Sequence, residues 1–317
     1  MRSCLRRGRC TIALLLLLVA ALGARAEAPG PWLVVLGVGQ DGGVPQAGDP
    51  RPRRWADAAT ARRVVSIALV APASERRWLF EATPDLPAQL AELDRIAPVS
   101  GPAPRLAGIF LTHAHIGHYL GLAFLGHEAI GARGVPVHVM PRMASFLEEN
   151  GPWDQLVRFG NVRLERLAAE AAVALGDGLS VTPLPVPHRQ EYSEVVAFRI
   201  DGPHRSVLFL PDIDSWKAWD EAGTRLEDVL ASVDVAYLDA TFFADGEIPG
   251  RDMSGFPHPF VRTTMDRLAP LPADERAKVR FIHLNHTNPA LDPGSAARAE
   301  IETRGFRVAE EGERVEL

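Results

Sequence analysis

Three histidines that follow directly on an apolar stretch constrain the fold of this chain more than any other feature. Residues 107–111 have the apolar pattern of a buried strand, and His113 and His115 come immediately after them. A spacing of two along an extended backbone places both imidazole rings on the same face. His118 follows where a helical pattern begins, so its ring can turn back toward the same point. We therefore predict a metal site at this strand-to-helix turn, because histidine is the commonest protein metal ligand.

A chance cluster of core or surface histidines is the alternative interpretation of this motif. Four further candidates weaken it, because each lies at the C-terminal end of an expected strand: His188, Asp212, His283 and His286. Side chains at the ends of separate strands can meet at one edge of a sheet, and loops held by a rigid sheet commonly carry function. The joint placement favours a metal site over coincidence.

Short apolar runs alternate with amphipathic stretches along the chain after residue 31. The apolar runs predict strands at residues 32–38, 64–70, 78–82, 107–111, 135–139, 179–186, 195–200, 206–210, 235–239 and 279–284. The amphipathic stretches predict helices at residues 87–96, 117–130, 142–149, 260–268 and 295–304. Strands and helices interspersed throughout predict one α/β domain over residues 27–317 and not an all-β barrel.

Residues 1–26 have the three parts of a secretory signal peptide. Arginines at positions 2, 6, 7 and 9 form a positive start, an apolar run extends from Thr11 to Ala24, and Ala24-Arg25-Ala26 supplies a cleavage site. The apolar run is too short for a membrane-spanning helix, although an uncleaved N-terminal helix is the alternative. We expect cleavage near Ala26, a periplasmic or secreted location and no stable membrane anchor.

Cleavage at this point changes the chemistry available to the mature chain. It removes Cys4 and Cys10, the two cysteines of the sequence, so any metal must be held by His, Asp or Glu. It also removes five arginines, and the formal net charge moves from −6 to −11. A protein this acidic repels the phosphates of nucleic acid, which leaves a small-molecule substrate as the expected partner.

The candidate ligands resemble those of the metallo-β-lactamase superfamily, whose signature is His-x-His-x-Asp-His followed by later His, Asp and His ligands at strand ends. Thr112–His118 matches the His-x-His-x-x-His frame, and Pro187-His188 resembles the next ligand. Leu210-Pro211-Asp212 resembles the bridging aspartate, and Phe281–His286 resembles the terminal segment. The resemblance covers essentially the whole mature chain and implies an αββα sandwich of the metallo-β-lactamase type.

Within that superfamily the chain most resembles the coenzyme PQQ synthesis protein B (PqqB) group. The stretches that carry this resemblance are Gly39–Gln46, Glu81–Asp85, Gly250–Met253 and His283–Pro289. The Cys-rich structural metal site that follows Pro-Gln in the group is absent here, where Ala47-Gly48-Asp49 stands. The chain also keeps central histidines that several members of the group have lost. We therefore expect an exported relative of the group and not the cytoplasmic biosynthetic protein itself.

The resemblance to the superfamily also implies how the ligands divide between two metal sites. The first site would comprise His113, His115 and His188, and the second His118, Asp212 and either His283 or His286, with Asp212 bridging both. His283 is the better terminal candidate because it directly ends the apolar run, whereas His286 suits a substrate-contacting role. Zn²⁺ is the expected metal, as one or two ions, and Fe²⁺ also suits imidazole ligands.

Gly117 departs from the signature, because the superfamily has a metal-binding aspartate at that position. Glycine offers no ligand, so we expect a weak second site and a single tightly held metal. Another carboxylate can take the place of the missing one, and Asp41, Glu81 and Asp85 are the candidates. Asp85 also precedes the helix expected at 87–96, and we expect it to cap that helix.

Asp212, His258 and His286 are the candidate catalytic residues. Asp212 would be the natural partner for a metal-activated water. His258 precedes the helix expected at 260–268 and can line the pocket as an acid, base or substrate contact, or it is a loop histidine without a role. The other histidines are expected to be structural or solvated: His127, His138 and His204.

Three functions fit these residues. The leading interpretation is an exported metal-dependent hydrolase that uses metal-activated water on a small ester, lactone, amide or phosphoester. The resemblance to the PqqB group implies a second, namely iron-dependent oxidation of a PQQ precursor or carriage of PQQ. The third is a non-catalytic protein that binds a metal or another ligand on the same fold.

Overall fold

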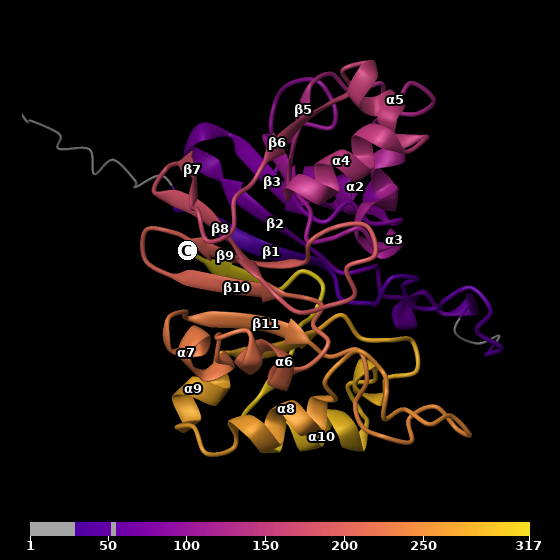
Figure 1. Cartoon of the computed structure of the whole chain (residues 1–317), viewed down its shortest axis with the longest axis vertical. Helices are drawn as coiled ribbons and strands as arrows, with labels where there is room; N and C mark the ends of the chain where they lie inside the picture. Colours follow the sequence, from indigo (N-terminus) through magenta and orange to yellow (C-terminus); the bar gives the residue numbers. More distant parts are fainter. Residues whose placement is uncertain (1–28, 52–54) are drawn as a thin grey trace, which may run out of the picture.

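The computed structural model describes residues 29–51 and 55–317 (Figure 1). The expected signal peptide, residues 1–26, lies outside the described residues. Across the part of the chain that is described, no helix combines the length and the apolarity needed to cross a membrane.

Two seven-stranded sheets form the centre of the described chain. The first sheet has the strand order β14-β1-β2-β3-β4-β5-β6. Its strands are β1 (Trp32–Gly37), β2 (Ser66–Ala71), β3 (Arg76–Phe80), β4 (Gly108–Phe110), β5 (Val135–Val139), β6 (Val162–Arg166) and β14 (Arg314–Glu316). From β3 to β6 the strands are parallel, whereas β1 runs antiparallel to both of its neighbours.

The second sheet has the strand order β13-β12-β11-β10-β9-β8-β7. Its strands are β7 (Val173–Gly176), β8 (Leu179–Pro185), β9 (Val196–Asp201), β10 (Ser206–Leu210), β11 (Val235–Asp239), β12 (Val279–Ile282) and β13 (Arg307–Val308). The strands β10 to β13 are parallel, so the C-terminal ends of β10, β11 and β12 lie at the same edge.

The inner faces of the two sheets pack on each other through aromatic side chains. Phe80 of β3 makes an edge contact with Phe198 of β9, with ring centroids 5.6 Å apart, and stacks on Phe110 of β4 at 5.0 Å. Within β1, Leu33 and Val35 belong to this inner core, and the alternate residues face outward. A strand buried on both faces reads as a continuous apolar run, which is why these strands are evident in the sequence.

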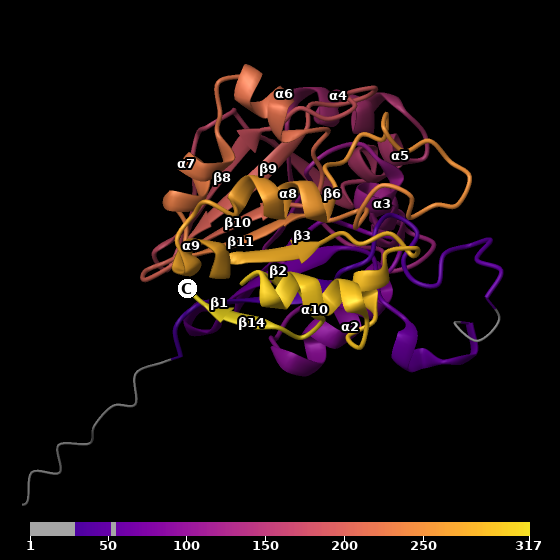
Figure 2. The same ribbon diagram turned by 90° about the horizontal axis from the view of Figure 1, so that it is seen from below.

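Helices cover the outer face of each sheet (Figures 1 and 2). The first sheet is covered by α2 (Leu86–Ile96), α4 (Pro141–Glu149) and α5 (Trp153–Arg158). The second sheet is covered by α6 (Trp216–Glu221), α7 (Leu226–Ala231), α8 (Val261–Leu268), α9 (Ala273–Ala277) and α10 (Ala296–Thr303). The order helix, sheet, sheet, helix confirms the predicted α/β fold class, an αββα sandwich.

The long helix expected at residues 117–130 is wrong. The chain forms a single turn of α-helix, α3 (Ile116–Tyr119), and then a 3₁₀ segment, η3 (Leu120–Leu125). Turns follow the 3₁₀ segment, and His127 lies exposed in one of them and not on a helix.

Gly121 explains why the regular helix ends so early. Its N–H donates to the carbonyl oxygen of Ala82 at 2.8 Å, in the loop that follows β3. A Cβ at this position would overlap the carbonyl oxygen of Thr83 and lie 2.9 Å from that of Ala82. The turn that carries His118 is therefore fixed by direct backbone-to-backbone packing.

The expectation that Asp85 caps the following helix is also wrong. Asp85 occupies the N-cap position of α2, but its side chain makes no capping hydrogen bond there. Its carboxylate instead accepts a hydrogen bond from the backbone N–H of Val64 at 2.8 Å, just before β2. Asp85 thus joins two loops and lies outside the groups of donors that could hold a metal among the described residues.

The close approach at Gly121 makes a testable prediction for stability. We expect Gly121→Ala to lower the free energy of unfolding by about 1–3 kcal/mol, because the added methyl group must push two backbone segments apart. Urea unfolding followed by circular dichroism measures the change. Gly255→Ala is the matched control, since a Cβ at Gly255 meets nothing within 4 Å. Equal free energies of unfolding for the two variants would contradict the prediction and show that the loop after β3 can move to accommodate the methyl group.

Candidate metal centre

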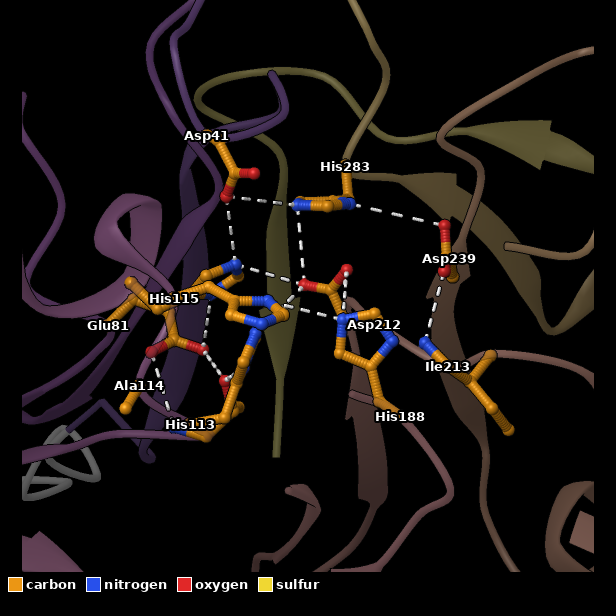
Figure 3. A network of polar contacts seen from close by, with 12 residues as sticks. Asp41, Glu81, His113, Ala114, His115, His188, Asp212, Ile213, Asp239 and His283 are labelled. Atoms are coloured by element: carbon orange, nitrogen blue, oxygen red, sulfur yellow. Dashed lines mark hydrogen bonds and ion pairs between the residues drawn. The ribbon is translucent and has the colours of Figure 1, made fainter. Parts of the chain in front are cut away.

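Six of the seven residues predicted to bind metal, all except His286, converge at one edge of the sandwich, where strands of both sheets end (Figure 3). Each follows the C-terminal end of a strand or lies in the helical turn after it: His113 and His115 after β4, His118 in α3, His188 after β8, Asp212 after β10 and His283 after β12. The centre is therefore assembled from both sheets.

A first group of donors comprises His113, His115 and His188. One nitrogen of each ring lies within 4.8 Å of the others, and Nε2 of His188 is 3.3 Å from Nδ1 of His115. His113 and His188 are buried, whereas the side chain of His115 is 16 % exposed. This group therefore opens toward solvent on the side of His115.

Hydrogen bonds behind the rings set which nitrogen faces the centre. Nδ1 of His188 donates to Asp214 at 2.9 Å, and Nδ1 of His113 donates to the hydroxyl of Thr112 at 2.9 Å. That hydroxyl donates in turn to Glu81 at 2.6 Å. The protons are held at Nδ1, so Nε2 of both rings is left with a lone pair.

Burial favours the neutral form that a metal ligand requires. It holds the pKa of His113 well below its usual range and also lowers the pKa of His188 and of His283. Nδ1 of His283 donates to the hydroxyl of Thr241 at 3.0 Å, which again leaves Nε2 toward the centre.

A second group of donors comprises Asp41, His118 and His283. Nε2 of His118 is 3.3 Å from Oδ1 of Asp41, and Nε2 of His283 is 4.0 Å from the same oxygen. Of the three carboxylates that the sequence offers in place of the one missing at Gly117, it is thus Asp41 that faces this group.

Asp212 lies between the two groups (Figure 3). Its Oδ1 is 3.7 Å from Nε2 of His188, and its Oδ2 is 3.0 Å from Nε2 of His118 and 3.3 Å from Nε2 of His283. Burial raises the pKa of this carboxyl, but its interactions with the rings of His283 and His118 outweigh burial and hold the pKa well below its usual range. Asp212 is therefore a carboxylate positioned to serve both groups.

Buried donor atoms without partners test whether these residues fit a metal ion. Among the described residues, six side-chain atoms at the centre are buried with no hydrogen-bond partner. One is Nδ1 of His118, which faces Glu81, and the other five are donor atoms of the two groups and of Asp212: Nε2 of His113, His118 and His283, Oδ2 of Asp212 and Oδ1 of Asp41. Leaving buried polar atoms unpaired costs free energy, and bound metal cations would satisfy the five donor atoms that face the centre. The donor set, imidazole with carboxylate, is one that Zn²⁺ and Fe²⁺ both accept.

Glu81 supports the ligands from behind. It is buried, and its Oε1 is 3.2 Å from Nδ1 of His118. Its backbone has φ 73°, a left-handed conformation that costs a non-glycine residue about 1–3 kcal/mol and is commonest at functional sites. Burial lowers the pKa of His118, but the charges of Glu81 and Asp212 outweigh it and raise the pKa well above the usual range. Glu81 is an orienting carboxylate on the far side of the ring.

His258 lies at the margin of the centre. Its Nδ1 donates to Asp239 at 2.8 Å and is 3.6 Å from Oδ1 of Asp212. Burial lowers the pKa of His258, but the charge of Asp239 and the hydrogen bond to it raise the pKa to about 9. The ring is therefore protonated at neutral pH and places a positive charge beside Asp212.

His286 belongs to no group of donors in the described chain, although two further groups exist besides the two above: one of His113, His118 and Asp212, and one of Asp212, His258 and His283. Its Nδ1 is 2.8 Å from the side-chain oxygen of Asn285, and it follows the turn that His283 begins. The structure thus brings His283, and not His286, to the other donors. The other histidines are away from the centre: His127 lies in a turn after η3, His138 stacks on Phe110, and His204 is in the exposed turn between β9 and β10.

The sequence did not single out Asp214, Asp239 or Thr241 as site residues. Asp239 had a signal, because it ends an expected strand just as Asp212 and His283 do. Thr241 and Asp214 had none, because each acts only through the ring nitrogen of a histidine that another segment carries.

Residues 76–266 match the family described as Beta-lactamase superfamily domain. The matched segment extends from β3 into α8 and contains His113, His115, His118, His188, Asp212 and His258. The chain belongs to this superfamily. Asp41 and His283 lie outside the matched segment, although the fold brings both to the centre.

Curated relatives narrow the resemblance within the superfamily. The chain is 27 % identical to coenzyme PQQ synthesis protein B of Methylobacterium sp. (strain 4-46), over 88 % of this chain and 97 % of the relative. It is 26 % identical to the protein of the same name from Ruegeria pomeroyi, over 88 % and 98 % of the two chains. The predicted resemblance to this group is confirmed.

Solved structures share the fold. Zn(2+)-bound PqqB from Methylobacterium extorquens has a TM-score of 0.74 at 24 % identity and covers 90 % of this chain and 100 % of that chain. A diphosphatase from the PhnP family has a TM-score of 0.64 at 20 % identity, covering 90 % and 97 %. Human tRNase Z, short form, has a TM-score of 0.54 at 15 % identity, covering 90 % and 98 %. The metallo-β-lactamase fold is therefore common to these proteins.

The positions of His283 and His286 predict different effects of the same substitution. We expect His283→Ala to lose the rise in thermal unfolding temperature that Zn²⁺ gives to the unaltered protein, because the second group loses a buried ring nitrogen. His286→Ala is the matched comparison and should keep that rise. Differential scanning fluorimetry with and without Zn²⁺ measures it. The opposite pattern would exchange the roles of the two histidines.

Proposed function

We propose that this protein is a metal-dependent hydrolase that acts on a small ester, lactone, amide or phosphoester. The observation that carries the proposal is the position of Asp212 between two groups of buried ring nitrogens. A metal ion supplies Lewis-acid polarisation of a substrate oxygen and acidifies a water molecule. His113, His115 and His188 of the first group would hold one ion, and His118 and His283 of the second group, together with Asp212, would hold another.

The residues around the centre have complementary protonation states. Asp212, whose pKa is well below its usual range, stays ionised and can accept a hydrogen bond that orients a nucleophilic water. His258, whose pKa is about 9, stays protonated and can donate to a leaving group or stabilise negative charge that develops there. A carboxylate that orients the water and an imidazolium that can donate a proton are both groups that hydrolysis can use.

The groups on the exposed side of the first group favour a small substrate. His115 is the partly exposed ligand of the first group, and Glu191 lies 3.2 Å from its Nε2. Two exposed apolar residues, Ile116 and Tyr192, adjoin these two residues in the chain. A carboxylate and apolar groups beside the exposed ligand disfavour a polyanionic substrate, and the net charge of the chain, −6, disfavours nucleic acid as well.

A role around PQQ is the second candidate. The relatives of about 26 % identity that cover most of the chain are named for PQQ synthesis, and imidazole ligands accept Fe²⁺ as readily as Zn²⁺. Under this alternative the protein would oxidise a PQQ precursor with bound iron or carry PQQ. Zn²⁺ remains the metal of the leading proposal, because hydrolysis needs no change of redox state.

Turnover and metal content together test the hydrolase proposal. We expect the zinc-loaded protein to hydrolyse at least one class in a panel of carboxylic, lactone, amide and phosphate esters. His113→Ala and His188→Ala should lower the rate about a thousandfold or more, because the Lewis-acid contribution is worth several kcal/mol. His204→Ala, an exposed histidine in a turn, is the control and should keep the rate.

Other outcomes of this experiment favour the alternatives. Iron as the metal retained after anaerobic purification, with no hydrolysis, would favour the role around PQQ. Bound zinc without turnover on any class would favour a non-catalytic binding protein.

We also propose that the protein is exported as a single domain of residues 27–317. The support is the order of the positive start, the apolar run and Ala24-Arg25-Ala26 in the sequence. Sequencing the N-terminus of protein from a periplasmic fraction should find Glu27 or a residue close to it. A chain that still begins with Met1 would contradict the proposal.

A further inference from the structure

We infer that Asp41 is a ligand of the second metal site, where it replaces the aspartate that the chain lacks at Gly117. Because Gly117 has no side chain, it leaves the space in which Asp41 reaches the site. The inference rests on the metal centre proposed above and adds to it a ligand from the opposite end of the chain.

The loop that carries Asp41 is held beside the terminal ligand by backbone hydrogen bonds. The N–H of Gln40 donates to the carbonyl oxygen of Leu284 at 2.9 Å, and the N–H of Leu284 donates to that of Val38 at 2.8 Å. Leu284 is the residue after His283, so the same pair of hydrogen bonds positions both side chains. Asp41 is therefore fixed on rigid backbone and not on the tip of a free loop.

Gly39 extends this attachment into the first sheet. It forms bridges both to Val64 and to Leu284, and its carbonyl oxygen accepts from the N–H of Val65 at 2.8 Å. The turn closes when the N–H of Gly43 donates to the carbonyl oxygen of Gln40 at 2.7 Å. Asp41 lies inside this turn, which is attached to segments of both sheets.

Gly117 and Asp41 occupy complementary space. A Cβ at Gly117 would overlap Oδ1 of Asp41 and lie 2.5 Å from its Cα and 2.9 Å from its Cβ. Atoms at these distances cannot coexist, and the Cα of Asp41 belongs to the fixed turn. No residue larger than glycine therefore fits at position 117 while Asp41 points into the centre.

The carboxylate of Asp41 is oriented as a ligand. Its side chain is 38 % exposed, yet Oδ1 is buried without a hydrogen-bond partner among the described residues and lies 3.3 Å from Nε2 of His118. Nε2 of His118 and Nε2 of His283 also face Oδ2 of Asp212, at 3.0 and 3.3 Å. Asp41 thus forms one group of donors with the two imidazoles, and Asp212 contacts the same two rings; imidazole with carboxylate is a donor set that suits a divalent cation.

This arrangement changes the expected number of metal ions. The absence of a carboxylate at Gly117 predicts one tightly held ion, whereas a second site with Asp41 as ligand has a full donor set. Placing aspartate back at position 117 is also not a simple restoration, because the new side chain would displace the turn that carries Asp41.

Metal content of the purified chain tests the inference. After loading with Zn²⁺ and dialysis, we expect about two ions per chain in the unaltered protein and about one in Asp41→Asn, because a neutral amide is a poorer ligand than a carboxylate. Gly117→Ala should also retain about one ion, although it alters no ligand, because its methyl group displaces Asp41. Absorption spectra of Co²⁺-loaded protein report the loss of one site independently of activity.

Matched controls separate these effects from general damage. Asp245→Asn removes an exposed loop carboxylate, and Gly255→Ala adds a methyl group that meets nothing within 4 Å; both should retain two ions. Circular dichroism of each metal-free variant verifies its fold. Should Gly117→Ala fail to fold, Asp41→Asn decides alone.

The failure of the inference differs from the failure of the metal centre. If the unaltered protein and Asp41→Asn retain the same number of ions with the same Co²⁺ spectrum, Asp41 is not a ligand and only this inference is overturned. If the unaltered protein retains no metal, the proposed centre itself is overturned, and the inference with it.

Discussion

The centre depends on a single buried carboxylate. Asp212 is ionised, almost fully enclosed, and approached by the ring nitrogens of His118, His188 and His283 at 3.0 to 3.7 Å. A buried charge is tolerated only where it is paired. An ionised Asp212 can therefore be buried only when the loops that carry these rings are all in place. The ends of several strands must therefore be positioned together for the centre to form.

The sandwich meets this condition because the strands that carry the ligands end at a common edge. Parallel strands within each sheet direct β4 on one side and β10 and β12 on the other toward that edge. Aromatic packing between Phe80 and Phe198 holds the sheets together in the interior. At the edge itself, backbone hydrogen bonds of Leu284 to Val38 and to Gln40 join the segments that follow β1 and β12. Rigidity in both places holds the donor side chains close together.

The sequence predicted the parts of the molecule whose signal is local. Strands buried on both faces were evident as apolar runs, and the histidines were evident because each follows such a run. Strands with exposed, charged residues were missed, as in β6 (Val162–Arg166) and β14 (Arg314–Glu316), because partial burial dilutes the apolar pattern. Helices of six residues, α6 and α7, were missed because so short a stretch shows little periodicity. The position of Asp41 depends on contacts with distant segments, and the one sign of it in the sequence is Gly117, which makes room for its side chain.

The loop after Asp41 is held in place by an ion pair. In the group that the sequence resembles, this segment carries a Cys-rich metal site. Here Arg51 makes two hydrogen bonds of 2.6 Å to the carboxylate of Asp49 and donates a third, of 3.2 Å, to the carbonyl oxygen of His286. A bidentate arginine–carboxylate pair is directional and strong when one partner is buried, as Asp49 is. It ties the segment to the strand end that carries His283. The loop that places Asp41 is thereby anchored on both sides without thiolates, which suits a chain that keeps no cysteine after residue 10.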